Sequence, residues 1–457
     1  MRYVSTRGAA VPEGFADILL SGLASDGGLI VPQAWPQFGA ETIAAFRGAS
    51  YADIAFQVLR PFVDGDFSDA ELRADIHDAY APFDHPSIAP LTELVGDRYI
   101  LELFHGPTCA FKDIAMQLLA RFFSRVLTKR AQRITVLVAT SGDTGAAAVS
   151  ALGGMANIEL FVLHPKGHIS DVQRRQMTTA VSANVHNIAV EGTFDDAQAI
   201  VKTLLSDATF VRDKGITAVN SINLVRIVAQ AVYYFASAAK LDMPAVFAVP
   251  TGNFGDAFAA EAAMRMGLPI RRIVVATNEN ANLAGALEDG IYGSPGVKHT
   301  LSPAMDIQVA SNFERALYQA TNGDTAWIAN AMRAFGAQKK LVLPLQILAR
   351  LHELYSAASI TDEETLACIG RVYEEYGRIV DPHTAVAIAA TEKIHPTGPV
   401  VMLSTAHPAK FPDAIRRACG VEPELPPQLR AVFDREERCE TLPASADAVR
   451  AFIARRV

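Results

Sequence analysis

The stretch from Ile134 to Gly145 reads Ile-Thr-Val-Leu-Val-Ala-Thr-Ser-Gly-Asp-Thr-Gly and decides the fold class. Its first half is apolar and rich in β-branched residues, which predicts a buried strand over 134–139. A glycine-bearing turn follows, and the alanine-rich segment after it predicts a helix. A strand that passes through a short turn into a helix is the unit of a parallel α/β sheet. Ligands are therefore expected at the turns that leave the strands.

The same alternation of strands and helices continues on both sides of this stretch. Short apolar runs predict further strands over 159–163, 185–190, 245–249, 273–276 and 400–403. Helical patterns separate them, including one from Phe194 to about Ser206 and one that ends at Gly267. Residues 325–380 are expected to be mostly helical. A last helix is expected near the C-terminus, capped by Ser445 and ending near Arg455.

The first ninety or so residues differ because they carry helical patterns without this alternation. Ser68 and Glu71 form a capping-box pattern there, and a cluster of prolines over 82–90 marks a boundary. The expected fold is α/β, with two domains rich in parallel strands and a mainly helical N-terminal domain. The expected division is 1–90, a large domain from 91–130 and 240–425, a smaller domain at 131–239, and a C-terminal extension over 426–457.

Composition indicates a soluble globular protein of two or three domains. The chain has 457 residues, of which 50% are hydrophobic and 20% charged. The 49 acidic residues exceed the 41 basic ones, and no basic run stands out. This charge balance argues against nucleic acid as a partner.

Cysteine usage and apolar runs point to a cytoplasmic protein. The four cysteines, at 109, 368, 419 and 439, show no paired spacing and no histidine-rich neighbourhood. We therefore expect neither a disulfide framework nor a metal site. The N-terminus lacks the apolar core of a signal peptide, and no run is long enough to cross a membrane.

Lys112 stands where a glycine-proline turn enters an apolar helix, in the sequence His-Gly-Pro-Thr-Cys-Ala-Phe-Lys-Asp over 105–113. Helical periodicity places it on the flank of Ala115, Met116 and Leu119, so its ammonium is expected to face the interior. Burial and the positive end of the helix dipole both favour the neutral amine. Such a lysine is a nucleophile that can form a Schiff base with a carbonyl. The alternative is a lysine that extends to solvent with its stem packed on the helix.

Two post-strand turns have the composition of anion sites. Thr140, Ser141, Asp143 and Thr144 surround two glycines at a helix start, which suits a carboxylate or phosphate. An ordinary helix cap explains the same residues equally well. The second turn, Gly252-Asn253-Phe254-Gly255-Asp256, matches neither the Walker loop nor the dinucleotide fingerprint.

Small residues at both ends of the second turn let the backbone approach an anion closely. Asp256 would repel an anion there, so its carboxylate is expected to turn away and cap backbone N–H groups. A third turn follows the strand at 400–403, where a hydroxyl such as that of Thr405 can bond to a heterocycle. Arg226, Lys166 and Asn220 are candidate substrate ligands, and Arg226 opens a helix after Asn220. Each of these is also consistent with an ordinary turn or a surface charge.

Taken in order, these motifs resemble the fold-type II enzymes that use pyridoxal phosphate (PLP). Within that class the chain resembles the threonine synthase family of the longer bacterial and fungal type, over nearly its whole length. The segments that carry the resemblance are Tyr3–Gly8, Phe104–Thr108, Ala110–Asp113, Thr140–Gly145, Gln176–Thr179, Asn220–Arg226, Gly252–Asp256, Thr277–Asn280, Ser302–Asp306 and Thr405–Phe411.

The resemblance implies a tryptophan-synthase-β-like fold and a role for each motif. Lys112 would hold PLP, the Gly252 to Asp256 turn would surround the cofactor phosphate, and Thr405 would meet the pyridine nitrogen. A neutral hydroxyl at that nitrogen would make the cofactor a milder electron sink. The Ser141 to Thr144 turn would handle the substrate carboxylate or the ring oxygen. Asp143 departs from the asparagine of many fold-type II enzymes, which leaves its role open.

The implied reaction converts O-phospho-L-homoserine and water into L-threonine and phosphate. Ser141, Thr144, Lys166 and Arg226 are the candidates for holding the substrate phosphate. The resemblance also implies a monomer. The rival hypotheses are another fold-type II lyase, such as a serine/threonine dehydratase or a threonine-synthase-like phospho-lyase, and a non-catalytic binding protein of the same fold.

Overall fold

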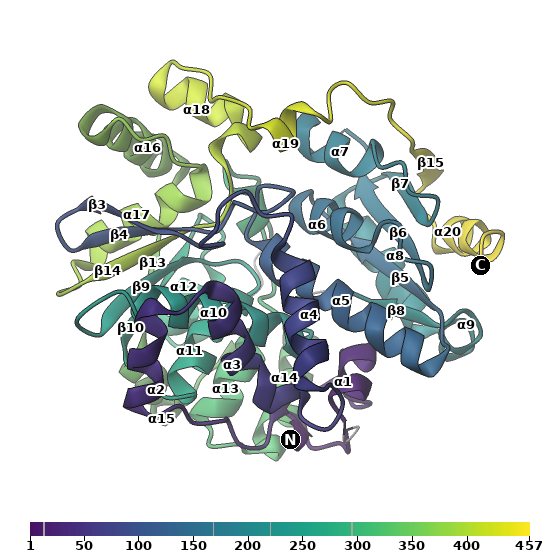
Figure 1. Cartoon of the computed structure of the whole chain (residues 1–457), viewed down its shortest axis with the longest axis horizontal. Coiled ribbons are helices and arrows are strands. Elements are labelled where there is room, and N and C mark those ends of the chain that lie inside the picture. The colour runs from purple at the N-terminus through teal and green to yellow at the C-terminus, as the bar shows by residue number, and fades with distance from the viewer. Residues whose placement is uncertain (12–13, 168, 220, 294–295) are drawn as a thin grey trace.

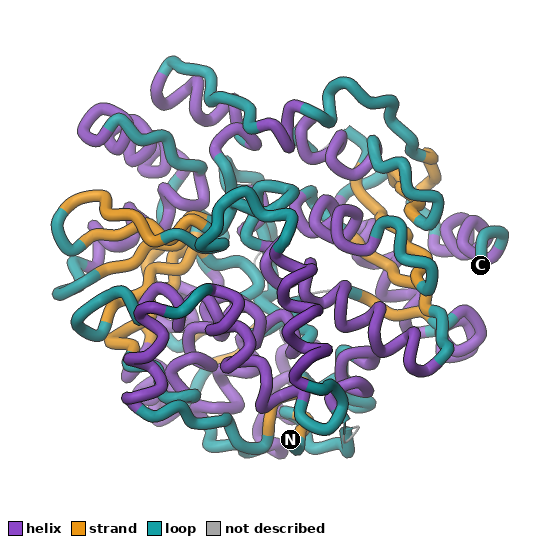
Figure 2. The backbone as a smooth tube through the Cα atoms, in the orientation of Figure 1, coloured by secondary structure: helices purple, strands orange, loops and turns teal. Residues whose placement is uncertain are grey.

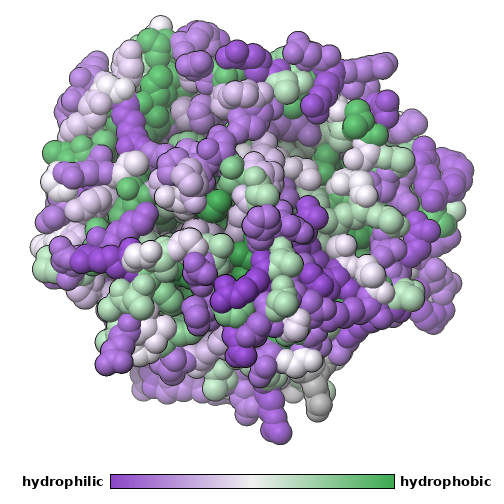
Figure 3. Space-filling model, viewed as in Figure 1, coloured by the Kyte–Doolittle hydropathy of each residue, from purple (hydrophilic) through white to green (hydrophobic). Residues whose placement is uncertain are grey.

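The computed structural model describes residues 1–11, 14–167, 169–219, 221–293 and 296–457. The strands of the described residues form two large sheets and two small two-stranded ones, and the two large groups lie apart among the helices in Figure 2. Each group is one α/β sheet, and the N-terminal helices pack beside the larger one (Figure 1). Most of the face shown in Figure 3 is hydrophilic, with hydrophobic residues in scattered patches.

The N-terminal region is mainly helical, as expected from the sequence. Ser68 accepts a hydrogen bond from the N–H of Glu71, whose carboxylate accepts one from the N–H of Ser68, so the capping box is confirmed. The elements are β1 (Tyr3–Ser5), α1 (Phe15–Ser21), β2 (Ile30–Pro32), α2 (Ala40–Ala45), η1 (Phe46–Gly48), α3 (Tyr51–Val63) and α4 (Asp69–Tyr80). Helix α3 packs against α10 (Leu224–Ala238), and helix α4 packs against α5 (Lys112–Arg130).

The larger sheet has six strands, five of them parallel, and the antiparallel one lies at an edge. Its order is β13 (Tyr355–Ser359), β10 (Ile270–Thr277), β9 (Ala245–Pro250), β14 (Val400–Ser404), β4 (Arg98–Glu102) and β3 (Leu91–Val95). Alternate residues of each strand face opposite helical layers. Val246 and Ala248 of β9 join the core beneath α16 (Asp362–Tyr376) and α17 (Pro382–Ile394). Phe247 and Val249 face the opposite layer, which includes α11 (Gly255–Arg265).

The remaining elements of this part of the chain surround the larger sheet or lead away from it. They are α10 (Leu224–Ala238), α12 (Asn282–Glu288), β11 (Ile291–Gly293), η2 (Pro303–Met305), α13 (Phe313–Ala320), α14 (Thr325–Gln338), β12 (Lys340–Val342), α15 (Leu345–Leu354), η3 (Pro408–Lys410), α18 (Pro412–Cys419) and α19 (Pro427–Arg430).

The smaller sheet has five parallel strands and includes the C-terminal end of the chain. Its order is β15 (Glu440–Pro443), β7 (Val185–Glu191), β6 (Ile158–Pro165), β5 (Ile134–Ala139) and β8 (Ile216–Ala218). Its helices are α6 (Asp143–Leu152), α7 (Asp171–Thr178), α8 (Phe194–Ser206), α9 (Ala208–Lys214) and α20 (Ala446–Ala454). In Figure 1 the yellow chain crosses the top of the molecule from α18 through α19 to β15, so the C-terminal segment spans both sheets.

Helix α5 (Lys112–Arg130) runs through the centre of the molecule. It packs against α4 of the N-terminal region, α6 of the smaller sheet and α10 beside the larger one. Leu118, Leu119 and Phe122 are fully buried, and the core that contains them extends through all three regions. The start of α5 is therefore held from several sides, which makes it a rigid place for a functional side chain.

Six of the seven inner strands of the two large sheets were predicted from sequence, whereas the inner strand β4 and the edge strands were not. The strands expected over 134–139, 159–163, 185–190, 245–249, 273–276 and 400–403 are all present, and α8 begins and ends as expected. The missed strands include the edges of both sheets, β3, β13, β8 and β15. An edge strand has one neighbour and needs no continuous apolar run: β13 reads Tyr-Ser-Ala-Ala-Ser, inside the region expected to be mostly helical.

Candidate functional site

The loop before Lys112 is held in one conformation by hydrogen bonds. The buried carboxylate of Asp113 accepts from the N–H and the hydroxyl of Thr108, at 2.8 and 2.7 Å. A Cβ on Gly106 would lie 2.4 Å from the Cβ of Asp113, so only glycine fits there. Cys109 has a left-handed backbone, with φ of 56°. The loop therefore presents Lys112 as the first residue of α5.

Backbone pairing joins this loop to the Thr405 turn after β14. Ala110 and Ala406 form an antiparallel bridge. The N–H of Phe111 donates to the carbonyl of Thr405 at 2.8 Å. These bonds place Thr405, itself 5% exposed, beside the residue that precedes Lys112. The arrangement brings together two residues that the sequence separates by nearly three hundred positions.

Lys112 has the electrostatic surroundings of a reactive amine. Desolvation lowers the pKa of its ammonium to about 8, although the side chain keeps some exposed surface. Asp143 and Asp256 raise that pKa, whereas Arg226 and Lys410 lower it. The Nζ atom lies 4.5 Å from the centre of the Phe111 ring. A substantial fraction of such a lysine is neutral near physiological pH and can attack an aldehyde.

The Thr140 to Gly145 turn lies on the other side of Lys112. The hydroxyl oxygen of Thr140 accepts from the N–H groups of Gly142 and Gly145, both at 2.9 Å. Thr140 therefore shapes the turn, whereas Ser141 and Thr144 are partly exposed and free to meet a ligand.

Asp143 is buried in this turn and forms an ion pair with Lys410. Its Oδ1 lies 2.6 Å from Nζ of Lys410 and accepts from the side-chain amide of Gln173 at 2.9 Å. Burial opposes the ionisation of Asp143, but the two nearby lysines, chiefly Lys410, and the hydrogen bonds outweigh it and hold the pKa far below its usual range. Lys410 was not a candidate in the sequence, although it follows Thr405 in the same turn. Gln173 gave no sequence signal, because only the fold brings α7 to the start of α6.

The glycine turn after β9 is fixed by Asn312. The backbone N–H and the side-chain amide of Asn312 both donate to the carbonyl of Asn253, at 3.0 and 3.1 Å. Phe254 is held in the left-handed region, with φ of 62°, and its ring packs against Phe313. A residue held in this region in a loop is a mark of functional sites. A Cβ on Gly252 would lie 2.9 Å from the carbonyl oxygen of Ala304.

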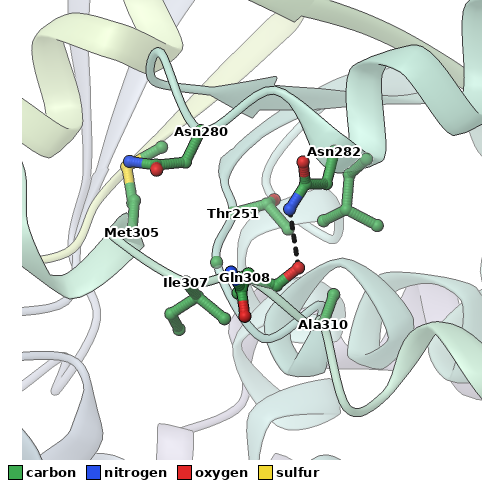
Figure 4. A pocket seen from close by; sticks show the side chains of 9 residues that line it. Thr251, Asn280, Asn282, Met305, Ile307, Gln308 and Ala310 are labelled. Carbon is green, nitrogen blue, oxygen red and sulfur yellow. Dashed lines mark hydrogen bonds between the residues drawn. The ribbon is translucent and has the colours of Figure 1, made fainter. Parts of the chain in front are cut away.

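A cavity of about 10 Å³ lies behind this turn (Figure 4). Thr251 and Gly252 line one side, and the segment from Met305 to Ala310 lines the other. Asn282 donates to the carbonyl of Gln308 at 2.6 Å across its wall. The volume is about that of one water molecule, so the cavity is too small to hold a cofactor.

The expectation that Asp256 caps backbone N–H groups is wrong. Its Oδ1 accepts hydrogen bonds from the hydroxyls of Tyr233 and Tyr234 on α10, the latter at 2.7 Å. Burial raises the pKa of Asp256 to about 6, and these hydroxyls and Lys112 oppose the rise. Because α10 packs against α11, the hydroxyls of Tyr233 and Tyr234 can reach the Asp256 carboxylate. That carboxylate therefore has donors without bonding to backbone N–H groups at the helix start.

Arg226 carries the strongest sign of an anion site. It is 4% exposed, and its Nε and Nη1 atoms are buried without a hydrogen-bond partner among the described residues. Burial lowers the pKa of its guanidinium to about 10, so it stays charged at neutral pH. A buried charged group that lacks a partner is costly unless a ligand pairs with it. Its field reaches Lys112, whose pKa it lowers.

The other two candidate anion ligands gain no support from the geometry. Lys166 is 54% exposed and lies 3.2 Å from Glu191 at the surface. Asn220 lies outside the described residues.

Two general absences hold for the part of the chain that the structure describes. No group of acidic, histidine or cysteine side chains there can hold a metal ion, and no helix there is long and apolar enough to span a membrane.

The residues around Lys112 fit an aldehyde cofactor that bears a phosphate. An amine with a pKa of about 8 would hold the aldehyde carbon, and the glycine turn at the start of α11, where a Cβ on Gly252 would clash with the Ala304 carbonyl, suits the close approach of a phosphate to the backbone. The model of the pyridoxal-phosphate-dependent enzymes matches residues 88–345. The fold and this site therefore define a fold-type II PLP enzyme.

Two further family models match the ends of the chain, the threonine synthase N terminus over residues 2–80 and the threonine synthase C-terminal region over residues 384–453. Threonine synthase of Pseudomonas aeruginosa is 45% identical over 99% of this chain and 98% of its own length. The crystal structure of PLP-bound threonine synthase from Brucella melitensis superposes with a TM-score of 0.97, at 45% identity and full coverage of both chains. That of the yeast threonine synthase superposes with a TM-score of 0.93, at 36% identity, covering 99% of this chain and 98% of its own. The chain belongs to the threonine synthase family and is a PLP-dependent lyase.

Proposed function

We propose that Lys112 is the residue that binds the aldehyde carbon of PLP. The turn of Gly252, Asn253, Phe254, Gly255 and Asp256 would surround the cofactor phosphate at the start of α11, where backbone N–H groups point outward. Thr405 would meet the pyridine nitrogen with a neutral hydroxyl. The support for this assignment is the backbone pairing of Ala110 with Ala406, which holds the Lys112 and Thr405 segments side by side.

We propose O-phospho-L-homoserine and water as the substrates, and L-threonine and phosphate as the products. When bound, PLP would withdraw electrons from the substrate and make its Cα and Cβ protons acidic. The amine of Lys112, freed from the cofactor, would accept the Cα proton as general base, because its lowered pKa suits proton transfer near neutral pH. A proton would leave Cβ and the phosphate would leave Cγ, after which Cγ would take up a proton, water would add at Cβ and Cα would regain its proton.

The two anionic groups of the substrate need separate partners. Arg226 would hold the substrate phosphate, since its side chain is buried and its Nε and Nη1 atoms have no hydrogen-bond partner among the described residues. Ser141 and Thr144, which remain partly exposed at the start of α6, would bind the substrate carboxylate. The observation that carries the proposed reaction is the lowered pKa of Lys112 in a chain that matches threonine synthases from end to end.

Turnover of the purified holoenzyme tests this function. The protein should be yellow, should release phosphate from O-phospho-L-homoserine and should form L-threonine in equal amount. Lys112→Ala should lose at least about a thousandfold in kcat because the amine is both cofactor anchor and base. Deamination of serine or threonine without phosphate release would favour the dehydratase instead. Failure to bind PLP would favour the non-catalytic binding protein.

We further propose that the enzyme works as a monomer in the cytoplasm, with the site between the two sheets. We propose that its domains follow the division expected from sequence, except that α10 belongs with the larger sheet and β15 and α20 with the smaller one. Its four cysteines are free and so suit a reducing compartment. Light scattering of the purified enzyme at working concentration checks the monomer.

A further inference from the structure

Lys410 joins three separate segments around Lys112. It is fully buried, and its Nζ lies 2.6 Å from the Asp143 carboxylate at the start of α6. The same ammonium donates to the backbone carbonyl of Thr108, in the loop before Lys112, at 2.8 Å. Because Lys410 itself belongs to the turn after β14, one side chain ties the smaller sheet to both segments of the larger one.

Asp143 faces two lysines and is bonded to one of them. Lys410 and Lys112 both stabilise its anionic form, and Lys410 has the larger effect. The ammonium of Lys112 lies instead against the Phe111 ring. The charged groups that act on Lys112 are Asp143, Asp256, Arg226 and Lys410, and Asp143 has the largest effect of the four.

We propose that Lys410 is a positioning residue that occupies the Asp143 carboxylate and so keeps it from pairing with Lys112. The proposal rests on the proposed function, in which Lys112 must be a free amine to hold the cofactor. In a desolvated site a carboxylate pairs with the nearest cation. Without Lys410, the nearest remaining cation for Asp143 would be Lys112, and its ammonium form would be stabilised.

This assignment also accounts for an aspartate in a turn that handles anions. A lone carboxylate next to a cofactor or substrate anion would repel it. The pair of Asp143 and Lys410 is neutral as a unit, and Gln173 satisfies a further site on the carboxylate. The turn thus keeps the hydrogen bonds of Asp143, and the Asp143–Lys410 pair adds no net charge to the site.

Capture of PLP by the apoenzyme measures the proposal without turnover. PLP is removed, the cofactor is added back, and the rate at which the lysine-bound absorbance band appears is followed from pH 6 to 10. For Lys410→Met we expect the midpoint of this profile to rise by about one unit or more, because Asp143 then stabilises the Lys112 ammonium. Capture near pH 7 should slow about tenfold, as one unit of pKa changes the neutral fraction tenfold.

A second substitution separates this role from a merely structural one. In the Lys410→Met, Asp143→Asn double variant the competing carboxylate is gone, so the midpoint should return to or below the wild-type value. A structural role for Lys410 predicts that the second change adds damage without restoring the midpoint. Lys202→Met, which removes an exposed lysine of α8, should leave the profile unchanged.

Four results would overturn or redirect the assignment. An unchanged midpoint in Lys410→Met, or a raised one that Asp143→Asn fails to reverse, contradicts it. If Lys410→Met does not fold, Asp143→Asn alone still decides, because the midpoint must then fall below that of the wild type, and a rise refutes the proposal. Capture that survives in Lys112→Ala would instead refute the proposed function.

Discussion

At the residue scale, two buried carboxylates lie at helix starts where an anion is expected, and each has a different compensation. Asp143 stays ionised and pairs with the ammonium of Lys410. Asp256 pairs with two tyrosine hydroxyls, and burial raises its pKa to about 6, so it is partly neutral near physiological pH. Both solutions reduce repulsion of a ligand anion while keeping a hydrogen-bond acceptor in the site.

Arg226→Gln tests whether the unpartnered guanidinium binds the substrate phosphate. We expect kcat/KM for O-phospho-L-homoserine to fall about a hundredfold or more, since one or two charge-assisted hydrogen bonds would be lost. Most of this loss should come from a higher KM. The PLP content, measured by absorbance, should be the same as in the wild type. Lys166→Gln, a cation removed from the surface, is the matched control and should retain wild-type kinetics. Loss of PLP from Arg226→Gln would show that Arg226 holds the cofactor phosphate instead.

At the scale of the element, the start of α6 depends on one glycine. Gly142 has φ of 140° and ψ of −83°, a conformation that side chains disfavour. Its α-hydrogen faces Gln173, the residue that donates to Asp143. Because Gly142 has no Cβ, the side chain of Gln173 on α7 can pack against the start of α6 and donate to the Asp143 carboxylate there.

Gly142→Ala should destabilise the protein by about 2–4 kcal/mol, through backbone strain together with a clash. The added Cβ would lie 2.5 Å from the Gln173 side chain. Gly167→Ala is the matched control, because Gly167 also has a positive φ, of 77°, but has no atom within 4 Å of the added Cβ. That control should cost about 1 kcal/mol in urea unfolding. Equal costs for the two variants would show that the clash with Gln173 is unimportant.

At the scale of the whole molecule, the C-terminal segment holds the two sheets to each other. After α18 beside the larger sheet, Leu429 packs against Cys109, Val172 and Ala409, at the junction of the sheets. The chain then adds β15 to the edge of the smaller sheet and ends in α20, which packs against α8 (Figure 1). The extension expected from sequence over 426–457 is thus structurally part of the smaller sheet.

Phe452→Ala should destabilise the smaller sheet by about 3–5 kcal/mol, the cost of removing a buried aromatic side chain. Phe452 is 3% exposed and its ring lies 6.1 Å from that of Phe161 on β6. Hydrogen exchange should show the loss of protection first in β7 and β15. Phe433→Ala, at a ring that is 40% exposed, should cost less than about 1 kcal/mol. A Phe452→Ala cost no larger than this control would mean that α20 is dispensable.

Much of the fold was predictable because the inner strands and long helices carry strong local patterns. Strand β5 and helix α8 have the expected bounds, since each buries a regular set of apolar residues. The edge strands β13 and β15 were missed because one-sided pairing leaves no such pattern. For the site, the type and place of Lys112 and of the three turns were predicted, and their roles remain proposals.

The amino-acid sequence alone determined the class of fold, the position of Lys112 at a helix start and the order of motifs that identifies the family. These features are local, or depend on the linear order of residues, so no tertiary contact is needed to recognise them. Only the tertiary structure decided which charged groups pair: Lys410 pairs with Asp143, and two tyrosine hydroxyls bond to Asp256. Among the residues that the structure describes, none bonds to Nε or Nη1 of Arg226. Such pairings join distant segments, and their strength depends on burial and distance, neither of which a sequence contains.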